Sequence, residues 1–175
     1  MTDVVYYVAS SVDGFIATPD GGVDWLSHFE SSGEDYGYAG FYISIDAVLM
    51  GAHTYEQALG FEPWPYPDKP VRVFTARPLP SAGANVVLAG DDPASVVASL
   101  GRDGLSRLWL VGGGALAGSF QAAGLIDTYI ISIMPVLLGD GVKLLGGHAR
   151  SSSIVLEGVV RYPDGVVQHT YRTAR

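Results

Sequence analysis

The chain has 175 residues, of which 48% are hydrophobic and 16% charged, so it suits one folded domain and not an intrinsically disordered segment. Its formal net charge of -8 provides no basic surplus to neutralise phosphates, which argues against nucleic acid as a partner. The lack of cysteine excludes disulfides, thiol catalysis and thiolate metal sites.

Signals for a metal, for secretion and for a membrane are weak. The four histidines, at positions 28, 53, 148 and 169, are too scattered for a metal cluster, so we expect no metal. The N-terminus has no basic region before an apolar core, as a signal peptide would, and we therefore expect a cytoplasmic protein. The uncharged run 108–126 approaches the length of a membrane span, but its glycines, Ser119 and Gln121 favour a soluble strand, turn and helix.

The first half of the chain alternates strand and helix patterns. Residues 4–10 predict a strand, which runs into a glycine-containing loop at 11–22. An aromatic-rich short helix is predicted at 34–42, a strand at 45–50 and a helix from Gly51 to about Leu59. Four prolines between residues 60 and 70 predict an extended loop.

The second half continues this alternation and then becomes all β. Strands are predicted at 71–75, 86–88 and 108–111, and helices from Asp92 to about Leu100 and at 115–123. A β-rich run at 128–135 and a hairpin of residues 154–161 and 166–173 close the chain. The pattern predicts a single α/β domain over residues 1–175, with a mainly parallel central sheet and antiparallel C-terminal strands.

Two predicted strands end in glycine at the start of a helix. Gly112, Gly113 and Gly114 follow the apolar run 108–111, and Gly51 precedes His53 and Thr54. Free N–H groups and the helix dipole favour a phosphate at such a position. The alternative is structural: a tight turn at the glycine triplet and simple N-capping by Thr54.

Other side chains at strand ends are candidates for binding. Arg77 follows the strand at 71–75, and its planar guanidinium suits a phosphate monoester, although a lone arginine can equally be solvated surface. Trp25 belongs to a glycine-rich loop that could close over a ligand or be an ordinary turn. A carboxylate among the aromatic residues of 34–42, such as Asp35, could be partly desolvated and hold a proton near neutrality, or could simply be solvated.

Five motifs in a fixed order resemble one superfamily. They are Ser-Val-Asp-Gly-Phe-Ile-Ala at 11–17, Val-Leu-Met-Gly-Ala-His-Thr-Tyr-Glu at 48–56, Phe-Thr-Ala-Arg at 74–77, Val-Gly-Gly-Gly at 111–114 and Pro-Val-Leu-Leu-Gly-Asp-Gly at 135–141. The chain resembles the dihydrofolate reductase fold. It is more similar to bacterial dihydrofolate reductase-like proteins that share their domain with the reductase half of the riboflavin-biosynthesis deaminase-reductase. The resemblance covers nearly the whole chain and implies a dihydrofolate reductase-like three-layer α/β fold.

This resemblance implies NADPH as the cofactor. The pyrophosphate would lie between two helix starts, held by Gly51, His53, Thr54 and the run Val111, Gly112, Gly113, Gly114, Ala115 and Leu116. The adenosine 2′-phosphate would lie at Thr75, Ala76 and Arg77, and Ala9 and Ile16 would line the nicotinamide pocket. Ala52 stands where a basic residue is common in the family, so a preference for NADP would depend largely on Arg77.

The resemblance also implies candidate catalytic residues. In dihydrofolate reductase an acid lies fifteen positions before the methionine of the Met-Gly pair, which corresponds here to Asp35, with Glu34 or Glu30 as alternatives. The riboflavin-type reductases suggest Asp13 instead, and Trp25 and Tyr36 are the expected substrate contacts. Ile131 replaces a threonine that helps to bind folate, so classical folate reduction is not the leading interpretation.

We therefore expect an NADPH-dependent reductase that transfers a hydride to a small heterocyclic or sugar-like substrate. The alternative is a non-catalytic NADP(H)-binding module that acts as a sensor or partner; in a third interpretation the glycine turns are purely structural. The apolar C-terminal hairpin, with Val155, Leu156, Val159 and Val160, predicts a homodimer, unless it only caps its own sheet.

Overall fold

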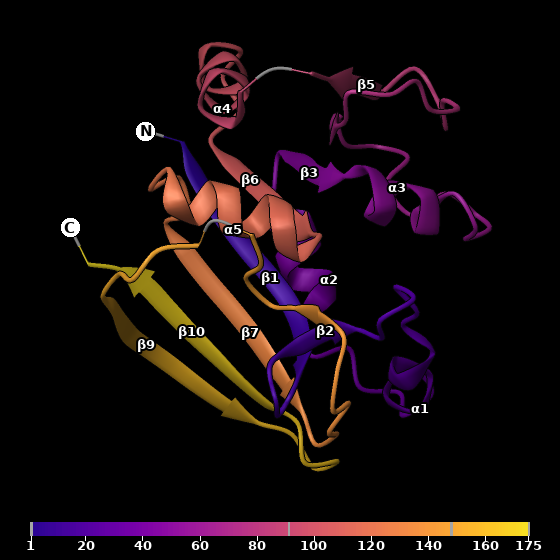
Figure 1. Cartoon of the computed structure of the whole chain (residues 1–175), viewed down its shortest axis with the longest axis vertical. Coiled ribbons are helices and arrows are strands. Elements are labelled where there is room, and N and C mark those ends of the chain that lie inside the picture. Colours follow the sequence, from indigo (N-terminus) through magenta and orange to yellow (C-terminus); the bar gives the residue numbers. More distant parts are fainter. Residues whose placement is uncertain (1, 91, 148, 175) are drawn as a thin grey trace.

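The computed structural model describes residues 2–90, 92–147 and 149–174, and an eight-stranded sheet forms its centre (Figure 1). The strands lie in the order β5 (Val86–Ala89), β4 (Val71–Phe74), β3 (Ala47–Gly51), β6 (Arg107–Gly112), β1 (Asp3–Ser11), β7 (Thr128–Met134), β10 (Val167–Thr173) and β9 (Ile154–Arg161). The pairs from β5 to β7 are parallel, whereas β10 is antiparallel to both β7 and β9. The predicted mainly parallel sheet with antiparallel C-terminal strands is confirmed.

Helices cover both faces of this sheet and make three layers. They are η1 (Asp24–Leu26), α1 (Ser27–Glu30), α2 (Tyr38–Ser44), α3 (Ala52–Ala58), α4 (Pro93–Arg102) and α5 (Gly114–Ala122). Because successive residues of a strand point to opposite faces, Val4 and Tyr6 of β1 pack in the core beneath α4 and α5, while Val5 packs in the core beneath α2 and α3. Strands buried on both faces explain the continuous apolar runs of the sequence.

Two segments differ from the sequence-based prediction. The helix predicted at 34–42 begins only at Tyr38, because Tyr36 and Gly37 both take left-handed backbone angles, with φ of 53° and 80°. Residues 15–17, expected in a loop, form β2 (Phe15–Ala17), which pairs antiparallel with β8 (Val142–Lys143) in a separate two-stranded sheet. Strands this short depend on a partner distant in sequence, which no local pattern reveals.

The Asp46 carboxylate ties the start of β3 to the start of β6. One of its oxygens accepts hydrogen bonds from the backbone N–H groups of Ser106 (2.7 Å) and Arg107 (2.9 Å) and from the Ser106 hydroxyl (2.9 Å). The hydrogen bond from the Ser106 backbone, followed by that from Arg107, holds the pKa of Asp46 below its ordinary value. Asp46 therefore stabilises the folded state in its ionised form.

We expect Asp46→Asn to lower the free energy of unfolding at pH 7 by about 1 kcal/mol, because charge-assisted hydrogen bonds become neutral ones. Since folding depresses the pKa of Asp46, its contribution is complete above the unfolded-state pKa and is lost as the pH falls below about 4. Urea unfolding at several pH values should show the difference from wild type shrinking in acid. Asp103→Asn, an exposed change at the end of α4, is the control. A difference independent of pH would contradict this role of the charge.

Candidate functional site

The two glycine-containing turns meet at one edge of the sheet. β3 runs through Gly51 into α3, the neighbouring parallel strand β6 runs through residues 112–113 into α5, and so both helices start at the carboxyl ends of adjacent strands. The backbone N–H of Gly113 donates a hydrogen bond to the Thr54 hydroxyl at 3.0 Å. The structure thus brings Gly51, Thr54 and Gly113 together, as the cofactor prediction requires.

The three consecutive glycines differ in what the backbone and the packing require of them. Gly112 has φ of 147°, which L side chains rarely adopt. At Gly114 a Cβ would overlap the Lys143 carbonyl oxygen, so glycine is needed for packing. At Gly113 neither reason applies, because φ is -32° and the nearest atom to an added Cβ is the Thr54 hydroxyl oxygen at 3.7 Å. The protein therefore tolerates an added Cβ at Gly113 in ordinary van der Waals contact, and its own packing does not require glycine there.

The segment 142–147 packs closely against α5. Besides the contact at Gly114, a Cβ at Gly118 would overlap the Gly146 carbonyl oxygen. Gly118 follows no turn signal, so the sequence analysis did not single it out. Part of the glycine content of this region therefore serves packing alone, in agreement with the structural alternative for Gly114.

Arg77 has an acidic partner at the exposed edge of the same region. Its guanidinium lies 2.7 Å from a Glu56 carboxylate oxygen, and the His53 Nδ1 lies 3.7 Å from the same oxygen. The hydrogen bond from Arg77 holds the pKa of Glu56 below its ordinary value. Both side chains are accessible, with 52% of Arg77 and 97% of His53 exposed. The sequence analysis missed Glu56, although it lies at i+3 from His53 within a quoted motif.

Thr75 and Ala76, the other two residues predicted to bind the 2′-phosphate, immediately precede Arg77. The Thr75 hydroxyl accepts a hydrogen bond from the Arg77 backbone N–H at 3.1 Å and donates one to the Arg77 carbonyl oxygen. This local turn presents the Arg77 side chain beside α3, while Ala76 between them is exposed. The predicted 2′-phosphate residues therefore lie together, and their role stays a prediction.

A pocket of about 250 Å³ opens on the sheet face that carries α2. It is bounded by β1, β6, β7, the η1–α1 segment and the start of α2, and it is lined by Tyr7, Val8, Ala9, Leu26, Phe29, Glu30, Asp35, Tyr36, Tyr38, Trp109, Ser132 and Met134. Trp109 lies on β6, the strand that leads into the glycine turn. The pocket and the turn are thus connected by one strand, and the predicted residues Ala9, Asp35 and Tyr36 share the pocket.

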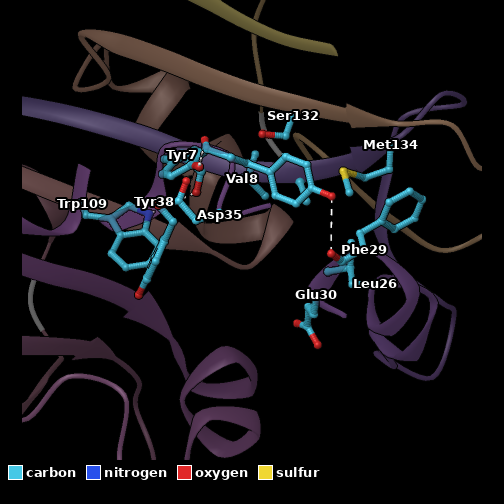
Figure 2. Close-up of a pocket in the computed structure, with 12 residues that line it drawn as sticks. Tyr7, Val8, Leu26, Phe29, Glu30, Asp35, Tyr38, Trp109, Ser132 and Met134 are labelled. Carbon is cyan, nitrogen blue, oxygen red and sulfur yellow. Dashed lines mark hydrogen bonds between the residues drawn. The ribbon is translucent and has the colours of Figure 1, made fainter. Parts of the chain in front are cut away.

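Aromatic rings form much of the pocket wall. Tyr38 meets Trp109 edge to face at 5.7 Å between ring centroids, and Tyr7 lies 6.3 Å from Trp109. Figure 2 shows Trp109 and Tyr38 toward one end of the pocket and Phe29 with Met134 toward the other. Such walls suit a flat ring, which can stack or meet them edge to face. The sequence analysis missed Tyr7 and Trp109, because buried aromatic residues of a strand look like ordinary core.

A polar network supports the chain at Tyr36. The Tyr7 hydroxyl and the Gln168 side-chain amide each donate a hydrogen bond to the Tyr36 carbonyl oxygen at 3.0 Å. Gln168 also donates to the Ser132 hydroxyl at 2.9 Å. Burial raises the pKa of Tyr7 to about 12, so its phenol stays a neutral donor. The left-handed backbone of Tyr36 is an uncommon conformation that this network holds in place.

The two acids predicted to be catalytic occupy different places. Asp35 lines the pocket, but its carboxylate oxygens accept hydrogen bonds from the backbone N–H groups of Gly37 (2.9 Å) and Ala39 (3.2 Å). Asp13 is not among the lining residues; its carboxylate accepts from the backbone N–H groups of Leu138 (3.1 Å) and Gly139 (2.7 Å). These backbone donors lower the pKa of Asp35, and for Asp13 a hydrogen bond with Ser11 lowers it most. Both acids are therefore ionised near neutrality.

Glu30, the alternative acid, is arranged differently. Its side chain lines the pocket, is exposed, and makes no hydrogen bond or ion pair with any described residue. In Figure 2 its carboxylate stands apart from the other labelled side chains. Glu30 thus has all of its acceptor capacity free, whereas two backbone N–H groups occupy part of that of Asp35.

The remaining predicted contacts lie at the margin of the pocket or outside it. Trp25 packs with Phe29, Met134 and Val166 in a small core and does not itself line the pocket. Ile16 lies in the middle of β2. The roles of both residues stay predictions. Within residues 2–90, 92–147 and 149–174, no group of His, Asp and Glu side chains could hold a metal, and no helix has the length and apolarity to cross a membrane.

Comparison with known proteins identifies the family. The family model of the RibD C-terminal domain matches residues 2–168. The uncharacterized protein YwjB of Bacillus subtilis (strain 168) is 36% identical over 169 residues, which are 96% of this chain and 97% of that protein. The match therefore covers both proteins almost from end to end.

Two solved structures share the fold. A crystal structure of a Shewanella sp. PV-4 protein, named for riboflavin biosynthesis, has a TM-score of 0.87 at 31% identity and covers 100% of both chains. The Thermotoga maritima diaminohydroxyphosphoribosylaminopyrimidine deaminase/5-amino-6-(5-phosphoribosylamino)uracil reductase has a TM-score of 0.73 at 16% identity, over 99% of this chain and 57% of that one, which shows the fold alone. The resemblance predicted from five motifs is confirmed, and the chain belongs to the family of the RibD C-terminal domain, the reductase domain of RibD.

Proposed function

We propose that the protein is an NADPH-dependent reductase that transfers a hydride to a carbon of a small heterocyclic substrate. The supporting observation is that β6 connects an aromatic pocket, at Trp109, to a glycine turn whose Gly113 is not required by the packing of the protein itself. A reductase needs these two features side by side, because the cofactor is anchored by its phosphates while its reactive ring must meet the substrate.

The donors present fit a dinucleotide phosphate. The Thr54 hydroxyl, which accepts from the Gly113 N–H, would donate its own hydrogen to the pyrophosphate at the start of α5, and Arg77 with Thr75 would hold the 2′-phosphate. When bound, NADPH supplies the hydride, and the protein positions the acceptor. The aromatic wall orients a flat ring, the neutral phenol of Tyr7 fixes the chain at Tyr36, and the ionised Asp35 can accept a hydrogen bond from a ring N–H.

A second candidate is a non-catalytic NADP(H)-binding module. It is favoured by the state of the two predicted acids, since hydrogen bonds lower the pKa of both Asp13 and Asp35 and leave neither protonated near neutrality. In such a module the pocket would bind its ligand without turnover. Oxidation of the bound cofactor separates the two candidates.

The deciding experiment is a titration of the protein with NADPH and with NADH, followed by quenching of Trp25, Trp64 and Trp109 fluorescence. Tight NADPH binding followed by cofactor oxidation in the presence of a pterin, pyrimidine or small imine supports the reductase. Binding without oxidation across the panel favours the non-catalytic module. If neither nucleotide binds, both proposals fail.

We also propose that the partner of this chain is a second copy of itself. β9 is an edge strand of the sheet, and Val155, Leu156, Val159 and Val160 on it are 56%, 52%, 50% and 48% exposed. These side chains point alternately to both faces, so a single covering helix could not shield them. An edge strand can pair antiparallel with its own copy across a two-fold axis, which satisfies its free backbone groups and gives each exposed apolar side chain a neighbour from the copy on the same face.

Light scattering after size exclusion should give a dimer mass at micromolar protein concentration. Val159→Lys should give a monomer with an unchanged far-ultraviolet circular dichroism spectrum, because it places a charge on the apolar edge. Val87→Lys is the matched control, since Val87 is 47% exposed on β5 at the opposite edge of the sheet. A wild-type monomer at this concentration rules out the dimer.

A further inference from the structure

Tyr36 attaches one wall of the pocket to the rest of the molecule. It lines the pocket and belongs to the segment 31–37, which joins α1 to α2. Within the part of the chain that the structure describes, this segment is hydrogen-bonded to the central sheet and its C-terminal hairpin only through Tyr36. The position of this wall therefore depends on the contacts that hold Tyr36.

Two sets of contacts hold different parts of Tyr36. Its carbonyl oxygen accepts hydrogen bonds from Tyr7 and Gln168, which fix the backbone. Its hydroxyl donates a hydrogen bond to a carboxylate oxygen of Asp164, in the turn between β9 and β10. Because a tyrosine side chain can change rotamer while its backbone stays fixed, the hydrogen bond to Asp164 fixes the direction of the ring.

The turn that carries Asp164 is itself firmly anchored. The other Asp164 carboxylate oxygen accepts a hydrogen bond from the Val166 backbone N–H at 3.3 Å. Val166 is fully buried in one small core with Phe29 and Met134, which both line the pocket. Gly165, with φ of 90°, takes the left-handed conformation that this tight turn requires. Asp164 thus extends from a fixed turn to a wall that has few other attachments.

The other possible partners of the Tyr36 hydroxyl belong to its own side of the pocket. The Ser32 hydroxyl lies 3.2 Å away, and the Phe29 carbonyl oxygen lies 3.4 Å away. Without Asp164 the phenol would still find an acceptor, so no buried donor would be left unsatisfied. The ring would, however, lose its connection to the hairpin. Loss of the Asp164 carboxylate should therefore loosen the wall more than it destabilises the fold.

The electrostatics favour a neutral phenol paired with a carboxylate. Burial, followed by the hydrogen bond to Asp164, raises the pKa of Tyr36, so its hydroxyl stays a donor near neutrality. Hydrogen bonds to an ionised acceptor are roughly twice as strong as neutral ones. An asparagine at position 164 would keep an acceptor oxygen and lose this charge, so it provides a graded change.

Resting on the proposed function, we propose that Asp164 is a positioning residue of the reductase, which fixes the Tyr36 ring as a wall of the substrate pocket. Asp164 does not line the pocket, so it acts on the substrate only through Tyr36. A site that is competent for binding only about one tenth of the time has an apparent affinity about tenfold lower. Substitution of Asp164 should therefore weaken binding in the pocket and leave the cofactor site unchanged.

Fluorine NMR of protein labelled with 3-fluorotyrosine tests the contact without any ligand. Tyr36→Phe identifies the Tyr36 line by its absence. We expect Asp164→Ala to shift this line towards its position in the urea-unfolded protein, and Asp164→Asn to shift it less in the same direction. Asp103→Ala, an exposed change at the end of α4, should leave the line unchanged.

Titration with 5-fluoroindole, an uncharged flat probe, tests the consequence for the pocket in protein saturated with NADP⁺. Asp164→Ala should bind the probe about tenfold more weakly than wild type, with Asp164→Asn between the two. Tyr36→Phe removes the donor of the same hydrogen bond, so adding it to Asp164→Ala should cause little further loss. The affinity for NADP⁺ should stay as in wild type in all of these variants.

The outcomes separate this inference from the reductase proposal. If the Tyr36 line is unchanged in Asp164→Ala, or if 5-fluoroindole binds wild type no better than this variant, Asp164 does not position the wall. Losses that add in the double variant also overturn it. Should Asp164→Ala fail to fold, Asp164→Asn and Tyr36→Phe give the same comparisons. If NADP⁺ does not bind, the reductase proposal fails instead, whereas the Tyr36 line is read without nucleotide.

Discussion

Gly113→Ala is expected to weaken NADPH binding by about tenfold or more while leaving the free energy of unfolding almost unchanged. The backbone at Gly113 is not in the left-handed region, and an added Cβ would find no atom nearer than the Thr54 hydroxyl oxygen at 3.7 Å. The fold therefore accepts alanine. A methyl group in this position would occupy the space proposed for the pyrophosphate and separate it from the N–H groups at the start of α5.

The matched controls are Gly114→Ala and Gly118→Ala, which change glycine to alanine within the next five residues. Their Cβ atoms would overlap the carbonyl oxygens of Lys143 and Gly146, so we expect each to lower the free energy of unfolding by about 1–3 kcal/mol. Urea unfolding and NADPH titration of the three variants give the comparison. If Gly113→Ala instead destabilises the fold and binds NADPH normally, the glycine triplet is a structural turn throughout.

Arg77→Ala is expected to weaken NADPH binding about 10- to 100-fold and to leave NADH binding nearly unchanged. A hydrogen-bonded charge on a phosphate contributes roughly 1.5–3 kcal/mol, and only NADPH has the 2′-phosphate. Fluorescence titration of the wild type and variant with both nucleotides gives the ratio. Arg102→Ala, an exposed change in the last turn of α4, is the control. An equal loss for both nucleotides would contradict 2′-phosphate recognition.

A Glu56 variant gives a second test of 2′-phosphate recognition by Arg77. It lies 2.7 Å from the Arg77 guanidinium and competes with a phosphate for the same cation. Glu56→Gln removes the competing charge, so NADPH should bind several-fold tighter at low ionic strength, with a smaller gain as salt screens the pair. Weaker binding in Glu56→Gln would mean that Glu56 positions Arg77 for the nucleotide.

The elements dominated by local patterns were predictable. The apolar run 108–111 and the β-rich run 4–10 form β6 and β1, and the predicted hairpin of residues 154–161 and 166–173 is the antiparallel pair β9 and β10. The five motifs also identified the family correctly, because each combines a strand end with residues whose spacing is short and fixed. In these cases a few neighbouring residues are enough to predict the local structure or to identify the family.

Contacts between residues far apart in the chain could not be predicted from the sequence. Only the contact with Lys143 distinguishes Gly114 from Gly113, and only the approach of the turn after β4 to α3 gives Arg77 its partner Glu56. The pocket combines Tyr7, Trp109 and Ser132 from three strands, and Gln168 from a fourth supports it.

The sequence by itself therefore determined the strands of the central sheet, the glycine turns and the family of this protein. The tertiary structure decided which glycine tolerates an added Cβ, which carboxylates accept hydrogen bonds from backbone N–H groups, and which acid lines the pocket without a partner among the described residues. The physical reason is that backbone conformation follows from neighbouring residues. By contrast, steric room, hydrogen-bond partners and local charge depend on contacts between segments that the sequence separates by tens of residues.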